Sequence, residues 1–217
     1  MSNKEFPSGF PYYNREKLKF FLELETAIKN VFLAKSAEQV VLPCVDWTEA
    51  LTAKGGGEND KLIYPIGDAS RALRFDLTVP LTRYVNQNQQ LIRKNTKIFQ
   101  IGPVWRADRP QKGRLREFYQ ADFDVVRCDN LEQQISEIAN MFQAILTTFG
   151  IETVLKTDMI RGQDYYIGSP FELEDKVSGL SVAGGGAYDM EKIGGPQFKC
   201  AGGSIGISRI VDLVCGR

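Results

Sequence analysis

Apolar residues recur at helical spacing in two long stretches of the chain. The first stretch predicts a helix over residues 14–35 with Asn14 as its N-cap. Its apolar positions are Leu18, Phe21, Leu22, Ile28 and Phe32. The second predicts an amphipathic helix over residues 130–149, stopped by Gly150. Its stripe, which we expect to lie in the core, comprises Leu131, Ile135, Ile138, Met141, Phe142 and Ile145.

Shorter apolar runs predict strands and one further helix. We expect strands over residues 39–43, 62–66, 71–76 and 153–157, with a turn at Gly67-Asp68. Residues 77–86 are predicted to form a helix, because Pro80 is tolerated in a first helical turn. The Gly-rich stretch 52–60 is expected to be flexible.

The most informative pattern is a strand, a polar loop and a returning strand over residues 97–124. Pro110 and Gly113 mark the loop. One face of the returning strand carries Arg116, Phe118, Gln120, Asp122 and Asp124. An ordinary half-buried strand has one apolar face and one solvated face. Here polar groups stand two residues apart on a rigid sheet, which is typical of the floor of a binding site.

Composition narrows the class of protein. With 217 residues the chain is long enough for one large domain with its own core. Lys plus Arg and Asp plus Glu both number 27, so the net charge is zero and no basic run indicates a general nucleic-acid footprint. No apolar run has the length of a membrane span and the N-terminus lacks a signal-type core, so we expect a cytoplasmic protein.

Cysteine and histidine usage restricts the chemistry further. Cys44, Cys128, Cys200 and Cys215 show neither C-x-x-C pairing nor metal-ligand spacing, which favours scattered reduced thiols. The chain contains no histidine. Histidine-dependent catalytic triads and histidine metal sites are therefore excluded.

Several blocks, in order, resemble those of class II aminoacyl-tRNA synthetases of the histidyl type. Residues 97–124 resemble motif 2, and Arg-Pro-Gln-Lys-Gly-Arg at 109–114 is close to its histidyl form. Residues 73–80 resemble the block that holds the substrate's amino group. Residues 161–173, beginning Arg-Gly-Gln-Asp-Tyr-Tyr, resemble the block specific to histidyl-tRNA synthetases and their paralogues. Residues 14–43 resemble motif 1, residues 181–189 a glycine-rich family block, and residues 201–215 motif 3.

The chain departs from the family pattern at four positions. Ser208 replaces the usual acid before the motif 3 arginine, and Ala187 stands where a basic residue is usual. Asp108 and Asp124 are each one methylene shorter than the family's glutamate. The shorter acids imply a weaker contact near adenine and room for a changed ligand.

The resemblance implies an α+β fold, an antiparallel sheet of about six or more strands flanked by helices. It also implies one catalytic domain over residues 1–217, with residues 1–13 as a lead-in. Motif 1 forms the dimer in class II synthetases, so a homodimer is expected.

The implied activity joins a carboxylate to the α-phosphate of ATP and expels pyrophosphate. Arginines suit this reaction because they stay charged and form forked hydrogen bonds to carboxylate and phosphate. By resemblance, Arg106 and Arg161 are the catalytic residues. The residues that bind ATP are Arg106, Asp108, Arg114, Arg116, Phe118 and Arg209, with Phe118 and Arg209 enclosing adenine. Mg²⁺ should accompany ATP, with ligands that the sequence does not assign.

The resemblance also assigns an amino-acid pocket. Asp76, Thr78 and Gln120 match residues that hold the α-amino group, although Asp76 has the alternative role of capping the following helix. Asp124, Tyr166 and Tyr188 match residues that read an imidazole ring. An acid with tyrosine hydroxyls suits a ring that carries a donor and an acceptor, so histidine is the expected substrate.

The blocks that contact tRNA in histidyl-tRNA synthetases have no counterpart in this sequence. One helix and one strand are expected between Asp124 and Arg161, where the synthetases usually carry an insertion domain, and nothing follows motif 3. We therefore expect an activating enzyme with a non-tRNA acceptor, such as a small molecule, a peptide or a carrier protein. A histidine-binding regulatory subunit like that of ATP phosphoribosyltransferase, and a minimal or split tRNA ligase that needs a partner chain, remain as alternatives.

Overall fold

The computed structural model describes residues 5–52, 61–111, 113–157 and 166–216. These residues form a seven-stranded sheet in the order β1-β5-β6-β10-β9-β8-β7. Only the pairing of β1 with β5 is parallel. The strands are β1 (Glu38–Gln39), β5 (Thr96–Trp105), β6 (Glu117–Val126), β7 (Thr153–Lys156), β8 (Tyr166–Asp175), β9 (Ser181–Asp189) and β10 (Lys199–Ile205). The predicted α+β class with an antiparallel sheet is confirmed.

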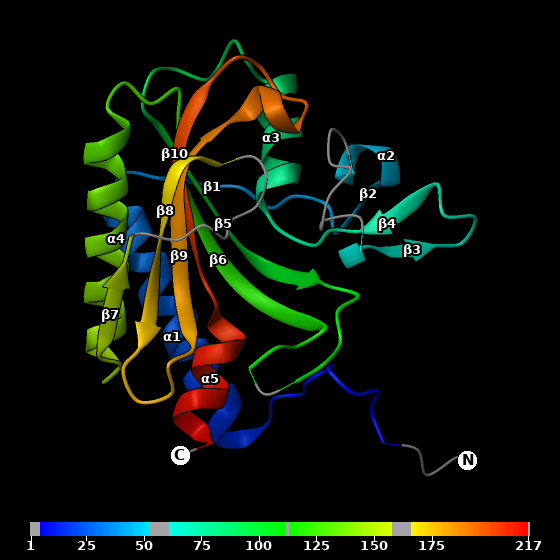
Figure 1. The fold of residues 1–217 in the computed structure, drawn as a ribbon, viewed down its shortest axis with the longest axis vertical. Coiled ribbons are helices and arrows are strands. Elements are labelled where there is room, and N and C mark those ends of the chain that lie inside the picture. The colour runs from blue at the N-terminus through cyan, green and yellow to red at the C-terminus, as the bar shows by residue number, and fades with distance from the viewer. Residues whose placement is uncertain (1–4, 53–60, 112, 158–165, 217) are drawn as a thin grey trace.

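A smaller three-stranded sheet and the helices complete the architecture. The small sheet has the order β2-β4-β3, with β2 (Val45–Trp47), β3 (Tyr64–Ile66) and β4 (Arg71–Leu73). The helices are α1 (Arg15–Ala34), α2 (Thr48–Leu51), α3 (Thr78–Gln87), α4 (Leu131–Thr148), the 3-10 turn η2 (Met190–Ile193) and α5 (Ile207–Cys215). In Figure 1, α1 and α4 run along one side of the large sheet, whereas α3 and the small sheet lie on the other.

Alternation along β6 separates the core from the opposite face of the sheet. Ala121, Phe123 and Val125 belong to the main hydrophobic core, which they share with buried residues of α1, α4 and α5. The alternate residues Gln120, Asp122 and Asp124 are also buried but point to the other side. The core therefore fixes the plane of the sheet, and the polar residues of β6 are held on a rigid surface.

The two long predicted helices are confirmed within a residue or two of their expected ends. Asn130 caps α4, since its side chain accepts a hydrogen bond from the Gln133 N–H at 3.2 Å. Asn14 occupies the cap position of α1 but makes no side-chain capping bond. Arg15, the first residue of that helix, has a φ of 45°, which lies outside the helical region. Pro80 lies in the first turn of α3, as predicted.

All four predicted strands are shorter in the structure: those expected over 62–66 and 153–157 form over Tyr64–Ile66 and Thr153–Lys156. The other two end near one buried side chain, Arg74. The strand expected over 39–43 ends at Gln39, and the strand expected over 71–76 ends at Leu73. Arg74 donates from Nη1 to the Leu42 carbonyl at 2.9 Å and from Nε to the Pro103 carbonyl at 2.9 Å. These bonds satisfy backbone groups that strand pairing would otherwise use. Arg74 thereby ties the small sheet to β5.

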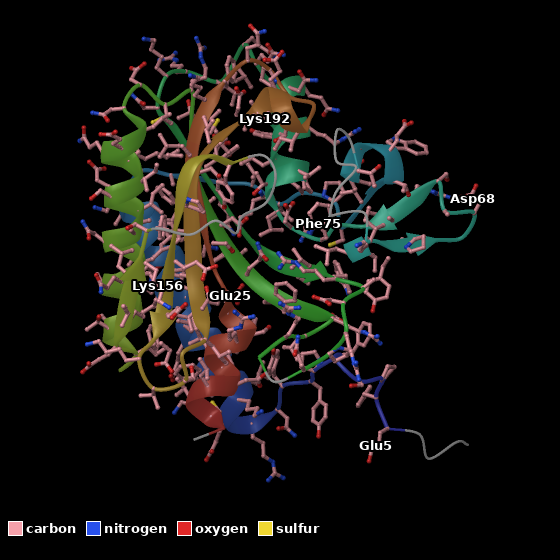
Figure 2. All side chains as sticks on the ribbon, viewed as in Figure 1. Glu5, Glu25, Asp68, Phe75, Lys156 and Lys192 are labelled. Atoms are coloured by element: carbon pink, nitrogen blue, oxygen red, sulfur yellow. The ribbon has the colours of Figure 1, made fainter. Side chains whose placement is uncertain are left out.

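The segment between β4 and α3 lies where the two sheets meet. Figure 2 shows Phe75 at this junction and Asp68 at the outer tip of the β3–β4 turn. Phe75 is 1% exposed and packs with Leu51, Ala72 and Val79. This packing places Asp76, the next residue, beside the face of the large sheet that carries the polar residues of β6.

The remaining expectations concern cysteines, membrane spans and the Gly-rich stretch. All four cysteines are free. None of the helices in the described ranges has the length and apolar character needed to cross a membrane. The predicted flexible stretch 52–60 lies outside the described residues, apart from Thr52.

Candidate active site

A cleft of about 740 Å³ opens on the face of the large sheet opposite α1 and α4. Its floor comes from β6, β9 and β10, and its walls come from β8, the start of α3 and the start of α5. Eleven of the residues predicted for the site line it, namely Asp76, Thr78, Arg106, Asp108, Arg114, Phe118, Gln120, Asp124, Tyr166, Tyr188 and Arg209. Arg161 lies outside the described residues, so its catalytic role stays a prediction.

One end of the cleft is acidic and buried. Asp76, Asp122 and Asp124 are 2%, 4% and 3% exposed, respectively. Asp124 lies directly opposite Gly202 of β10, where an added Cβ would come within 2.0 Å of the Asp124 carboxylate oxygen. Position 202 therefore requires glycine because any side chain there would occupy the space of the Asp124 carboxyl. The backbone angles of this residue do not require glycine.

Hydrogen bonds fix the orientation of the acidic side chains. The Tyr188 hydroxyl donates to Oδ1 of Asp124 at 2.8 Å, and Nε2 of Gln120 donates to Oδ1 of Asp122 at 2.8 Å. Oδ1 of Asp76 accepts from the Val79 N–H at 3.1 Å, so this residue both caps α3 and lines the cleft. The two roles proposed for Asp76 are therefore compatible.

Burial and mutual repulsion shift the pKa values of these groups. Burial raises the pKa of Asp122 to about 7; the Asp76 carboxyl adds to the rise, whereas hydrogen bonds from Ser204 and Gln120 and the charge of Arg106 oppose it. Burial, followed by the charge of Asp122, raises the pKa of Asp124 well above its usual value. Burial and the three carboxyls also raise the pKa of Tyr166. The acidic end therefore favours an occupant that brings positive charge.

The ligand-free protein is expected to lose stability as the pH rises. Native Asp122 holds a proton up to about pH 7, whereas in the unfolded chain it releases that proton near its ordinary pKa of 3.8. The native state thus binds more protons between these values, and Asp122 alone should lower the free energy of unfolding by about 2–3 kcal/mol from pH 5 to pH 8. The raised pKa of Asp124 acts in the same direction. Urea unfolding at the two pH values measures this change. A profile that is flat, or one that rises with pH, would contradict the assignment.

The opposite end of the cleft is cationic. Arg209 of α5 donates from Nε to the Gly113 carbonyl at 2.8 Å and from Nη1 to the Ser181 carbonyl. Burial, followed by the charges of Arg106 and Arg114, lowers the pKa of Arg209. These three guanidinium groups therefore lie close enough to repel one another, and an anion between them would relieve that repulsion.

The cationic end also contains an ion pair that a ligand can replace. Nη1 of Arg114 lies 3.0 Å from Oδ2 of Asp108, and the two side chains are 53% and 30% exposed. An ion pair this exposed contributes little to stability. A phosphate group can therefore compete with Asp108 for Arg114 at small cost.

Arg106 connects the two ends. Its Nε donates to the Phe75 carbonyl at 3.0 Å, and its guanidinium carbon lies 5.0 Å from the centre of the Phe118 ring. Its charge lowers the pKa of Asp122 at one end and that of Arg209 at the other. A group bound by Arg106 is thus within electrostatic reach of both the carboxyls and the other arginines.

One predicted ATP-binding residue is not among those that line the cleft. Nε of Arg116 donates to the Asp108 carbonyl at 2.9 Å, so this side chain supports the loop between β5 and β6. The assignment of Arg116 to ATP therefore stays a prediction.

Several residues that line the cleft had no role predicted from the sequence, among them Asp122, Glu172 and Ser204. The alternation along β6 places Asp122 on the cleft face. The positions of Ser204 and Glu172 depend on strand pairing that the sequence does not reveal.

A family model described as histidyl-tRNA synthetase matches residues 13–156. The chain belongs to the histidyl-tRNA synthetase family. The histidine–tRNA ligase of Bacteroides fragilis (strain YCH46) is 35% identical over 195 residues, which cover 77% of this chain and 41% of that protein. The chain thus spans about two fifths of the length of this curated relative.

Solved structures of the family share the fold. The histidyl-tRNA synthetase from Nostoc sp. PCC 7120 superposes with a TM-score of 0.79 at 19% identity, covering 99% of this chain and 75% of that one. A protein described as ATP phosphoribosyltransferase regulatory subunit/histidyl-tRNA synthetase, from Bacillus halodurans C, gives a TM-score of 0.82 at 13% identity, with coverage of 99% and 84%. The expected class II synthetase-like architecture is confirmed.

Proposed function

We propose that this chain activates an amino acid with ATP, forming an aminoacyl-adenylate, and that histidine is the amino acid. The observation that carries the proposal is the division of the cleft into a buried acidic end and a cationic end, with Arg106 coupled to both. An amino acid bound by its ammonium group at the acidic end presents its carboxylate toward the arginines. A nucleotide held at the cationic end places its phosphates at the same point.

The reaction joins a carboxylate oxygen to the α-phosphorus and releases pyrophosphate. Two anions must approach each other, so preorganised positive charge lowers the barrier. Arg106 is positioned to contact the amino-acid carboxylate and the α-phosphate together, because its Nε is anchored on Phe75 while its charge acts on both ends. Arg114 and Arg209 hold the rest of the triphosphate and the adenine side, with Phe118 as the stacking surface.

Magnesium enters this proposal with the nucleotide. The described residues contain no group of three or more metal-binding side chains, so they do not form a cage of their own for a metal ion. Mg²⁺ commonly takes most of its ligands from phosphates and water and only one or two from carboxylates. When bound, it would neutralise charge on the triphosphate, and its protein ligands are not assigned.

The choice of histidine rests on the paired groups at the acidic end. Asp124, held by the Tyr188 hydroxyl, and the half-buried Tyr166 both line the cleft, and a hydrogen-bonding pocket of this kind rejects ligands that lack the matching groups. The family match supports the same choice.

A second part of the proposal concerns the molecule that accepts the activated amino acid, which we infer is not tRNA. Between Asp124 and residue 157 the described chain forms, besides the end of β6, only α4 and β7, where the family usually carries an insertion that clasps tRNA. The net charge is zero, and binding to nucleic acid without base contacts depends on positive charge.

Pyrophosphate exchange with ATP, measured for each of the twenty amino acids, tests the proposal. Histidine alone is expected to stimulate exchange, because only its side chain satisfies the pocket that contains Asp124 and Tyr188. If none of the twenty amino acids stimulates exchange, the proposed activating enzyme is contradicted and the regulatory-subunit alternative is favoured. Acylation of total tRNA by the same preparation would overturn the non-tRNA acceptor while leaving the activation step in place.

A further inference from the structure

We propose that Asp122 is a further specificity-determining residue of the amino-acid site: it receives the ligand's positively charged amino group and orients Gln120 toward it. The inference deepens the proposed function and rests on it. Asp122 is 4% exposed and its carboxyl lines the cleft between Gln120 and Asp124 on the same face of β6. The resemblance to the family assigns it no role.

The contact between Asp122 and Gln120 determines what the amide presents to a ligand. Nε2 of Gln120 donates to Oδ1 of Asp122 at 2.8 Å. The carbonyl oxygen of the amide then points to the other side of the amide plane. Gln120 therefore offers an acceptor beside the carboxyls of Asp76 and Asp122. Three acceptors match the three donors of an ammonium group, and a carboxylic acid or an alcohol would leave them unpaired.

The neighbouring strands hold the Asp122 carboxyl in place. Ser204 of β10 lies directly opposite it, and the Ser204 hydroxyl is hydrogen-bonded to the carboxyl. On the other side, Gln100 of β5 lies opposite Asp122 and is 2% exposed. Oε1 of Gln100 has no hydrogen-bond partner among the described residues, although buried acceptors normally have one. Side chains directly opposite in an antiparallel pair lie within contact distance. When Asp122 is protonated in the ligand-free protein, Oε1 of Gln100 therefore lies beside it as a hydrogen-bond acceptor.

The charged surroundings of Asp122 make ligand binding depend on proton release. The titratable groups that face it are Asp76 and Arg74 before α3, Arg106 just after β5, Asp124 on β6 and Tyr166 on β8. Burial raises the pKa of Asp122 to about 7, whereas an ammonium ligand favours the ionised carboxylate. Histidine should therefore bind more tightly as the pH rises from 6 to 8, with release of a proton from Asp122.

The test uses Asp122→Asn, which keeps an oxygen for Gln120 and removes the charge. Calorimetric titration at pH 8 with histidine and with its des-amino analogue, 3-(imidazol-4-yl)propanoate, measures the preference for the amino group. The variant is expected to bind histidine about 10- to 100-fold more weakly, with little change for the analogue. Its KM for ATP in the exchange assay should be unchanged. The variant should also lose the part of the pH dependence of histidine affinity that comes from proton release by Asp122. Titrations in two buffers of different ionisation enthalpy measure the number of protons released on binding.

A matched control separates this role from a purely structural one. Asp175 is 1% exposed and accepts from the Ser178 N–H at 2.9 Å, a bond that an amide oxygen can also accept. Asp175→Asn should leave the preference for the amino group unchanged, because Asp175 is not among the residues that line the cleft. Asp122→Asn should raise Tm at pH 8 by a few degrees, because it removes a charge from a repelling cluster; a loss of Tm with equal weakening of histidine and ATP would overturn the inference as a structural effect.

The outcomes also separate this inference from the proposed function. If the wild type is active and Asp122→Asn keeps the same preference for histidine over the des-amino analogue, the inference is overturned but the proposed function is not. A wild-type chain that neither binds nor activates histidine overturns the proposed function, and the inference with it.

Discussion

Replacement of Arg106 by alanine should lower histidine-dependent pyrophosphate exchange by about 10²–10³-fold, equivalent to about 3–4 kcal/mol of transition-state stabilisation. Arg106 is the cation whose charge acts on both the acidic and the cationic ends of the cleft. Its loss leaves the two reacting anions without the shared positive group. The loss should appear mainly in kcat, since the ammonium site and the remaining arginines still hold the ligands.

Two further variants show whether charge alone suffices at this position. Arg106→Lys retains the charge but lacks the planar fork, so it should recover only a small part of the activity. Arg93→Ala, at an exposed position between α3 and β5, should leave exchange unchanged. Full activity in Arg106→Ala would remove the central step of the proposed reaction.

Replacement of Gly202 by alanine should abolish histidine binding. The added Cβ would lie 2.0 Å from Oδ1 of Asp124, 3.0 Å from Cγ of the same residue and 3.2 Å from the Tyr188 ring. Asp124 must therefore move, and its hydrogen bond with Tyr188 must break. Overpacking of this kind costs about 1–3 kcal/mol of folding stability. Calorimetric titration with histidine and urea unfolding measure the two effects.

Gly206→Ala provides the steric control for the effect on stability. An added Cβ there meets no atom closer than 3.6 Å, apart from its chain neighbours. Its stability should stay within about 0.5 kcal/mol of the wild type, as for substitutions without a clash. Undiminished histidine binding in Gly202→Ala would show that the ligand does not depend on the position of Asp124.

The part of the cleft floor that β6 supplies was predictable from the sequence, because it depends on the alternation of a single strand. The alternation along residues 116–124 places Gln120 and Asp124 on a face opposite Phe123, and a strand has only two faces. The stripe of α4 was predictable for the same local reason. These patterns need no knowledge of which segments pair with which.

Other features depend on pairing between distant segments and were not predictable. The register of β10 against β6 places Gly202 beside Asp124 and Ser204 beside Asp122. The two short strands end early because Arg74 bonds to carbonyls from other segments. Arg116 lies just before β6, and its Nε donates to the Asp108 carbonyl; it is not among the residues that line the cleft.

The division of the cleft into an ammonium-binding end and a phosphate-binding end is tested most directly by a crystal structure with histidine and a non-hydrolysable ATP analogue. The amino group is expected beside Asp76 and Asp122, the triphosphate among Arg106, Arg114 and Arg209, and the carboxylate next to the α-phosphate at Arg106. A triphosphate bound away from these arginines, or an amino acid whose ammonium group faces them, would contradict the account.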